Sequence, residues 1–182
     1  MININRSKYI WIAVLLIIIL IGISKLLNTT IYDESHTINE QDSGTKENAI
    51  IKKSNISERS LEAEETITNA IKYRNDKNLE KLLENYTDRN KKNKFRLDNL
   101  EKIELENIKL VTDESQYKNY IINLLLQEGD LEIDQVKIYR VTYNIMYKDE
   151  SLEPTGNGEE SKHYYLIKHK ESDKWLINDI GD

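Results

Sequence analysis

Hydrophobic and polar residues are distributed very unevenly along this chain. Residues 9–24 form an uncharged run, YIWIAVLLIIILIGIS, which Arg6 and Lys8 precede. Later apolar residues recur instead at intervals of two, or of three and four. Those intervals are the periods of a β-strand and of an α-helix. The pattern therefore predicts an N-terminal transmembrane helix followed by an α+β region.

The apolar run can cross a bilayer if its helix extends to Leu27. Nineteen residues at the helical rise span about 28 Å, close to a hydrocarbon core of roughly 30 Å. Because Arg6 and Lys8 lie on the short N-terminal side, this end is expected inside the cell and the rest outside. We predict a cytoplasmic stub and single-pass membrane anchor over 1–27. The alternative is a signal peptide that is cleaved, which would release a secreted protein.

Residues 28–58 show no sustained hydrophobic period. The segment is rich in Asn, Thr, Ser, Asp, Glu and Lys, a composition typical of a flexible linker with a span of about 30 Å. We predict a flexible tether over 28–58, with a short docking motif around Ile50 and Ile51 as the alternative. The strongly periodic stretches all lie in 59–182, which we predict to be one independent extracytoplasmic α+β domain.

Three helices are predicted in this domain. Apolar residues recur on one face over 60–74 and over 79–87, and Ser57 or Ser60 could cap the first of these helices. A third helix is expected from Asp113, where a capping signal precedes a regular apolar stripe. The residues expected on the buried face of the first helix are Leu61, Ile67, Ala70 and Ile71.

Four strands are predicted around the third helix. The first begins near residue 100, and its apolar positions change face between Leu105 and Ile108, which indicates a bulge or two short strands. The others are expected at 135–148, 164–168 and 175–180. Turn residues separate them, so the last three strands are expected to be antiparallel neighbours.

The stretch 135–148 gives the strongest strand pattern. Both of its faces carry apolar groups, so it is expected to lie centrally in the sheet. One face is expected to pack on the helices and the other to be a candidate interaction surface. The first face holds Tyr139, Val141, Tyr143, Ile145 and Tyr147, and the second holds Val136, Ile138, Arg140, Thr142, Asn144 and Met146.

Three phrases, in this order of elements, resemble the nuclear transport factor 2-like superfamily. They are the helix-turn phrase AIKYRNDKNL at 70–79, the strand at 99–111 and the ending KWLINDIG at 174–181. Over about 59–182 the chain is similar to an uncharacterised family of exported domains from low-GC Gram-positive bacteria. The resemblance implies a cone-like curved antiparallel sheet packed on helices, a cystatin-like arrangement with room for a pocket. It implies no reaction, because the superfamily contains both enzymes and binding modules.

Composition excludes several kinds of site. The chain has no cysteine, which removes disulfides, thiol catalysis and cysteine-based zinc sites. The total charge of −6 includes +3 from residues 1–27, so the remainder carries −9, which argues against nucleic-acid binding. His163 and His169 are about 20 Å apart along one strand and cannot share a metal ion. We predict no metal site, no cofactor and no catalytic residue.

Tyrosines are the most informative candidate binding residues. Tyr139, Tyr143 and Tyr147 share one strand face, where their hydroxyl groups could line a pocket for a polar ligand. The alternative is that they are half-buried residues of an ordinary sheet. The same three side chains could therefore be pocket residues or structural sheet residues, and only their surroundings in the fold can distinguish the two roles.

Other candidates are basic, flexible or large side chains. Arg140 and Met146 lie on the opposite strand face and are types enriched in protein interfaces. Trp175 is expected to pack against the helices, or to join a binding patch if it is exposed. The basic run at 89–96, RNKKNKFR, is expected to be a solvated loop, with a site for an anionic ligand as the alternative.

Two functional classes remain for such a chain. The first is a non-catalytic domain that binds a protein partner or a small ligand at the cell envelope. The second is a structural subunit of an envelope assembly, such as a conjugation or secretion machine, possessing a similar layout and associating with itself or with partners. A small enzyme of ketosteroid isomerase type is less favoured, because it requires a carboxylate in an apolar pocket beside a tyrosine. The acidic residues of this sequence cluster instead in turns and on polar faces.

Overall fold

The computed structural model describes residues 40–93, 95–128, 133–170 and 172–182. The chain divides into two units, Met1–Asp42 and Ser43–Asp182, and the second contains the folded region discussed below. The predicted membrane anchor at 1–27 lies outside the described residues. Among the residues that are described, no helix is both long and apolar enough to cross a bilayer.

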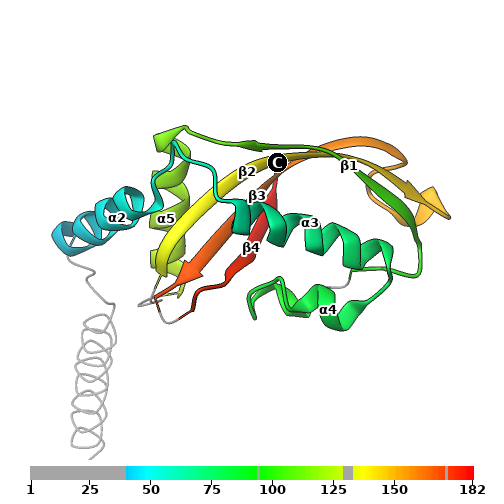
Figure 1. Ribbon diagram of the computed structural model, residues 1–182, viewed down its shortest axis with the longest axis horizontal. Coiled ribbons are helices and arrows are strands. Elements are labelled where there is room, and N and C mark those ends of the chain that lie inside the picture. Colours follow the sequence, from blue (N-terminus) through cyan, green and yellow to red (C-terminus); the bar gives the residue numbers. More distant parts are fainter. Residues whose placement is uncertain (1–39, 94, 129–132, 171) are drawn as a thin grey trace, which may run out of the picture. The chain divides into compact units, whose positions relative to one another are not determined.

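A four-stranded antiparallel sheet forms the centre of the second unit. Its strands, in spatial order, are β1 (Leu100–Leu110), β2 (Ile133–Tyr147), β3 (Gly158–His169) and β4 (Trp175–Gly181). Strands β1 and β2 arch over helix α3 (Figure 1). Strand β2 pairs with neighbours on both sides, which confirms its predicted central place.

The predicted irregularity in β1 is also present. The register between β1 and β2 shifts between Leu105 and Asn107. A bulge of this kind adds one residue to one strand. Side chains that face the core therefore occupy odd positions on one side of the bulge and even positions on the other. The change of apolar parity between Leu105 and Ile108 is therefore a correct sequence signal of the bulge.

The inner face of the sheet, defined here as the face toward α3 (Leu61–Asn75) and α4 (Leu79–Leu83), is covered by those two helices. Ser60 caps α3 by accepting a hydrogen bond from the N–H of Ala63 at 3.3 Å. Leu61 is 79% exposed, so its predicted burial is wrong, and Ala63 takes the buried position in the first turn. The inner core includes Ala63, Ile67, Ala70, Ile71, Leu82, Tyr139, Val141, Tyr143, Ile145, Tyr164, Leu166, Trp175 and Ile177.

The outer face is covered over only part of its area. Helix α5 (Glu114–Glu128) and helix α2 (Glu40–Ser54) pack there against the first half of β2. This second core contains Ile50, Tyr117, Ile121, Leu124, Ile133, Val136, Ile138 and Ile167. The short 3-10 turns η1 (Asn90–Lys92) and η2 (Glu150–Leu152) lie in the connecting loops.

Helix α2 corrects the predicted tether. The sequence analysis predicts a flexible segment over 28–58, whereas residues 40–54 form a helix and Ile50 is buried. The hydroxyl of Ser54 accepts a hydrogen bond from the N–H of Val136 at 2.8 Å, and Lys137 donates to the carbonyl of Asn55 at 2.9 Å. The folded region therefore begins upstream of the predicted boundary at 59.

The hydropathy pattern misses α2 for a physical reason. Its buried residues are Glu47, Ile50 and Ser54, which follow helical spacing but include only one apolar side chain. A docking helix whose contacts are largely polar produces no hydrophobic stripe.

Candidate functional site

Strand β2 divides the six predicted site residues between different surroundings. Side chains alternate along a strand, so Tyr139, Tyr143 and Tyr147 lie on the inner face, while Arg140 and Met146 lie on the outer face. Trp175 begins β4 and is buried in the inner core. The six residues therefore do not form one site.

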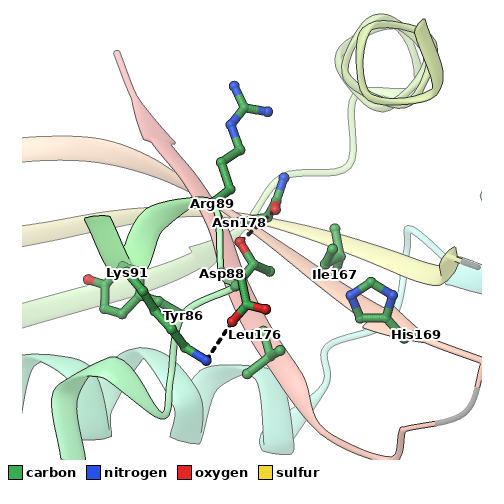
Figure 2. A pocket seen from close by; sticks show the side chains of 9 residues that line it. Tyr86, Asp88, Arg89, Lys91, Ile167, His169, Leu176 and Asn178 are labelled. Carbon is green, nitrogen blue, oxygen red and sulfur yellow. Dashed lines mark hydrogen bonds and ion pairs between the residues drawn. The ribbon is translucent and has the colours of Figure 1, made fainter. Parts of the chain in front are cut away.

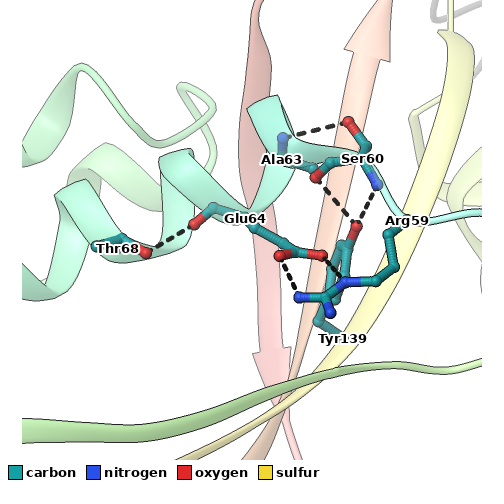
Figure 3. Close-up of polar contacts among 6 residues, drawn as sticks. All are labelled: Arg59, Ser60, Ala63, Glu64, Thr68 and Tyr139. Carbon is teal, nitrogen blue, oxygen red and sulfur yellow. Dashed lines mark hydrogen bonds and ion pairs between the residues drawn. The ribbon is translucent and has the colours of Figure 1, made fainter.

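The hydroxyl of Tyr139 forms its hydrogen bonds with Ser60, at the start of helix α3. It accepts a hydrogen bond from the N–H of Ser60 at 2.9 Å and donates to the Ser60 carbonyl at 3.2 Å (Figure 3). Beside it, Arg59 and Glu64 form an ion pair, with 2.7 Å between Arg59 Nε and Glu64 Oε1. Tyr139 thus fixes the entry of α3 onto the sheet, which supports the interpretation as a structural sheet residue.

Tyr143 lies beside a carboxylate, the arrangement that an isomerase-like site would require. Its hydroxyl donates to Glu160 Oε2 at 3.0 Å, and the other oxygen of Glu160 accepts a hydrogen bond from Thr155. Both carboxylate oxygens are therefore satisfied by groups of the protein. Burial, followed by the electrostatic influence of Tyr164 and then of Glu160, raises the pKa of Tyr143, so the phenol is neutral at physiological pH.

Arg140 and Met146 belong to an uncovered part of the outer face. We call this part the open outer strip, and it consists of Arg140, Thr142, Asn144 and Met146 on β2. Arg140 is exposed and Met146 is 39% exposed. The face that was predicted as an interaction surface is therefore divided: Val136 and Ile138 are fully buried under α5 and α2, and the later positions remain open.

Trp175 forms part of the wall of a cleft between α3, α4 and the β3–β4 turn. The cleft has a volume of about 320 Å³ and an acidic rim that includes Glu62, Glu65 and Glu84. The indole is nevertheless only 5% exposed, and the Trp175 carbonyl accepts a hydrogen bond from Thr66 at 3.3 Å. Its predicted packing against the helices is observed.

A second recess lies at the edge of the outer face, beside the basic loop that follows α4. It has a volume of about 230 Å³ (Figure 2). Its walls come from the loop at 86–91 and from the paired strands β3 and β4. We call it the basic-loop pocket, and it is lined by Tyr86, Thr87, Asp88, Arg89, Lys91, Ile167, His169, Leu176 and Asn178.

Backbone pairing fixes this loop against β4. Thr87 donates its N–H to the carbonyl of Ile177 at 3.1 Å, and Ile177 donates to the carbonyl of Asn85 at 2.8 Å. The buried hydroxyl of Thr87 also donates to the side-chain oxygen of Asn178 at 2.8 Å. In turn, the Asn178 amide donates to the hydroxyl of Tyr120 on α5 at 2.8 Å. A continuous hydrogen-bond network therefore holds the polar part of the pocket in place.

Charged side chains surround the hydrogen-bonded base of the basic-loop pocket. Asp88 and Lys91 form an ion pair at 2.8 Å, while Arg89 extends from the same loop and His169 lies on the other side, on β3 (Figure 2). The hydrogen bond from Lys91 lowers the pKa of Asp88, so this carboxylate remains ionised and its charge is balanced by its partner. Arg89 and His169 add further nitrogen-bearing side chains to the wall of the pocket.

A comparison with protein families covers most of this region. A family model described as "Domain of unknown function (DUF4829)" matches residues 64–181. The chain belongs to the DUF4829 family. The expectation of an uncharacterised family is thereby confirmed. Neither the curated proteins nor the solved structures gave a significant match.

The DUF4829 match begins within α3 and ends with the last residue of β4. It therefore includes the basic-loop pocket, the open outer strip and all of the Trp175 cleft except Glu62, whereas α2 lies before it. Among the described residues of this DUF4829 chain, no group of three or more His, Cys, Asp or Glu side chains is arranged to hold a metal ion.

The sequence identifies the basic run at 89–96 but does not reveal the pocket beside it. The pocket needs Asn178 and His169, which are about 80 to 90 positions away from the loop in sequence. Neither residue has a hydropathy signal, and their meeting with Thr87 depends on the pairing of the loop with the edge of β4. The Asn178-Asp179 pair near the end of the chain is the local sequence feature that indicates polar residues at the base of the pocket.

Proposed function

We propose that this chain is a membrane-anchored, non-catalytic binding protein whose domain lies outside the cytoplasm. We further propose that the basic-loop pocket binds a small anionic ligand. The observation that carries the proposal is a recess of about 230 Å³ with a hydrogen-bonded floor and nitrogen-bearing side chains at its rim. Ligand pockets commonly combine an apolar lining with a few fixed polar groups, and here Ile167 and Leu176 supply the apolar part.

The charge distribution supports this choice of ligand class. Residues after the anchor carry −9 in total, so the overall electrostatic field of the protein repels anions. Arg89, Lys91 and His169 nevertheless place nitrogen-bearing side chains around one recess. Hydrogen-bond donors fixed beside a hydrogen-bond network could select an anion by local contact rather than by the field of the whole domain.

A binding titration with matched variants would test this assignment. Inorganic phosphate and succinate are suitable probes, added at constant ionic strength and followed by calorimetry. Lys91→Gln and His169→Gln should each weaken binding, whereas Lys118→Gln, which removes an exposed charge from α5, should not. Absence of binding for both probes, or an equal loss in the Lys118 variant, would contradict the pocket assignment.

Location is part of the same proposal and has its own test. The basic residues before the apolar run favour an inward N-terminus, and residues 28–182 are then outside. Protease added to intact protoplasts of the producing cell should remove the domain. Full protection would refute the topology, and release into the medium without protease would favour the cleaved signal peptide.

We also propose a nuclear transport factor 2-like fold for this domain. The order of two helices, a strand, a helix and three antiparallel strands supports it. Within that superfamily an isomerase-type site remains the enzymatic alternative. The satisfied carboxylate of Glu160 argues for the non-catalytic proposal, because its two oxygens already accept hydrogen bonds from Tyr143 and Thr155.

A second candidate function is partner binding or self-association through the open outer strip, as a subunit of an envelope assembly. It is favoured by the exposure of Met146 and Arg140 in the middle of a sheet face, where such residues are usually covered. A tether to the membrane would raise the local concentration of such a surface and allow a weak interface to be occupied.

A further inference from the structure

The pairing of the strands arranges side chains in rows across the outer face of the sheet. Residues that pair across antiparallel strands project to the same face. Arg140 of β2 pairs with Lys109 of β1 and with His163 of β3, so these three side chains form one row. In the next row, the hydroxyl oxygens of Thr142 and Ser161 are 3.3 Å apart, which places them on a common face.

Three successive rows on this face differ in chemical character. The first is basic, the second is uncharged and the third is acidic. Neighbouring rows lie about 7 Å apart, because alternate residues of a strand point to the same face. The basic row consists of Lys109, Arg140 and His163, the neutral row of Asn107, Thr142 and Ser161, and the acidic row of Glu104, Asn144 and Glu159.

Several charges in these rows are not neutralised within the chain. Lys109, Arg140 and Glu159 are exposed and form no ion pair with another residue that the structure describes. Glu104 differs, because it pairs with Lys102 on the same strand. The basic and acidic rows are about 14 Å apart, too far for ion pairs between them in one molecule. A contact between opposite charges therefore requires a second molecule.

A second copy of the chain, turned end over end, presents the rows in the opposite order. A two-fold axis that runs across the strands, along the neutral row, reverses the strand direction in the second copy. The basic row of each copy then faces the acidic row of the other, and the attraction occurs twice because the contact is isologous. A two-fold axis parallel to the strands would instead place the two basic rows against each other, which is repulsive.

The helices on the outer face favour the same arrangement. Helices α5 and α2 cover this face as far as Ile138, and the open outer strip runs from Arg140 to Met146. An axis along the neutral row places the helices of the two copies at opposite ends of the contact, so the two strips can approach each other. An axis parallel to the strands would bring all the helices to one end. Each helix is about 10 Å thick, so they would hold the strips apart.

We propose that the open outer strip, with the flanking residues of the three rows, binds a second copy of this chain in the antiparallel orientation. The inference rests on the second candidate function above and names the partner for that surface. Sheets packed face to face lie about 10 Å apart, a gap that an arginine and a glutamate side chain span together. Arg140 of one copy thus meets Glu159 of the other, which lies in the facing row on the neighbouring strand.

The size of this surface makes the dimer a weak one. Three strands spaced about 4.8 Å apart, over about 20 Å of their length, present far less than the roughly 800 Å² per partner of a stable complex. The proposed anchor would confine both copies to one membrane and raise their effective concentration, which compensates for the low affinity. The attraction is between exposed charges, so association should weaken as the ionic strength rises.

Cross-linking in membranes tests this arrangement, because the chain has no cysteine of its own. Ser161→Cys places a thiol in the neutral row, where it faces the same residue of the second copy. Full-length protein with this change should form cross-linked dimers when a short bifunctional maleimide is added. Thr68→Cys, at an exposed position of α3 on the other side of the sheet, is the control and should form few. An equally low yield from Ser161→Cys would overturn the proposal.

Charge reversal then separates self-association from the binding of a different protein. In the Ser161→Cys chain, Arg140→Glu should lower the cross-linked fraction by about fivefold or more. The same charge change on α5, Lys118→Glu, should lower it less than about twofold. Adding Glu159→Arg to Arg140→Glu exchanges the two charges and should restore the dimer.

Failure of the exchange to restore cross-linking, in a double variant that still unfolds cooperatively in urea, would refute the antiparallel pairing. A different protein could instead be captured through Arg140 while the unmodified chain stays monomeric. That result would refute self-association but leave the binding function of the strip intact. Loss of neither cross-linking nor capture in the Arg140→Glu chain would contradict both.

Discussion

The two faces of the central sheet differ in how completely they are covered. On the inner face of β2, Tyr139, Val141, Tyr143 and Ile145 are all buried beneath the layer of α3 and α4. On the outer face, coverage by α5 and α2 stops after Ile138. The same strand therefore serves as core along one side and changes from core to surface along the other. Apolar alternation alone does not reveal where a covering layer ends.

The inner face should show the largest effect of a single substitution. Trp175→Ala should lower the free energy of unfolding by about 3–5 kcal/mol, because the indole is 5% exposed and its removal leaves a large cavity. Urea unfolding gives the measurement. Ile180→Ala, on the same strand but 37% exposed, is the control and should cost much less. A loss below about 1 kcal/mol for the Trp175 variant would place the residue outside the core.

Alkaline pH should destabilise both sides of the sheet through buried tyrosines. Burial raises the pKa of Tyr117 and of Tyr139 to about 12, above the ordinary value of about 10. A raised folded pKa means that the stabilising contribution is fully present below about pH 10 and is lost as the pH rises toward 12. Unfolding free energies measured across this range should fall as ionisation proceeds, while tyrosinate absorbance rises. Constant stability through the range would show that these phenols are accessible.

The elements that could be predicted from the sequence are those with apolar contacts, and the elements that were missed are those with polar contacts. The inner helices and the central place of β2 were predictable because each produces a regular apolar period, and the bulge in β1 was predictable because it interrupts one. Helix α2 was not, since its contacts use Ser54 and Lys137 rather than an apolar stripe. Nor was the meeting of Thr87 with Asn178, because it depends on pairing between distant segments. Sequence periodicity identifies faces, whereas polar sites require the tertiary structure.

Docking of α2 on the outer face should depend on one buried hydroxyl. Ser54→Ala leaves the N–H of Val136 without its partner and should cost about 1–3 kcal/mol. Ser57→Ala removes an exposed hydroxyl nearby and serves as the matched control, with an expected change within about 0.5 kcal/mol. Equal stability of the two variants would show that α2 contributes little to the folded domain.

The open outer strip should tolerate charge with little loss of stability. Arg140→Glu combined with Met146→Asp should change the free energy of unfolding by about 1 kcal/mol or less, since both side chains are exposed. The same pair of changes should abolish any self-association or partner capture by this surface, as measured by analytical ultracentrifugation or pull-down. By contrast, Ile138→Asp on the covered half of the face should unfold the domain. Unfolding of the double variant would identify the strip as core.

Oxidative footprinting of the native full-length chain tests the two-sided sheet most directly, because it reports both faces in one experiment. Met146 and Trp175 are each readily oxidised when exposed, and mass spectrometry separates their peptides from those of Met1 and Trp11. The uneven coverage of the sheet predicts rapid oxidation of Met146 and protection of Trp175 until the domain unfolds. Protection of Met146 together with rapid modification of Trp175 would contradict it.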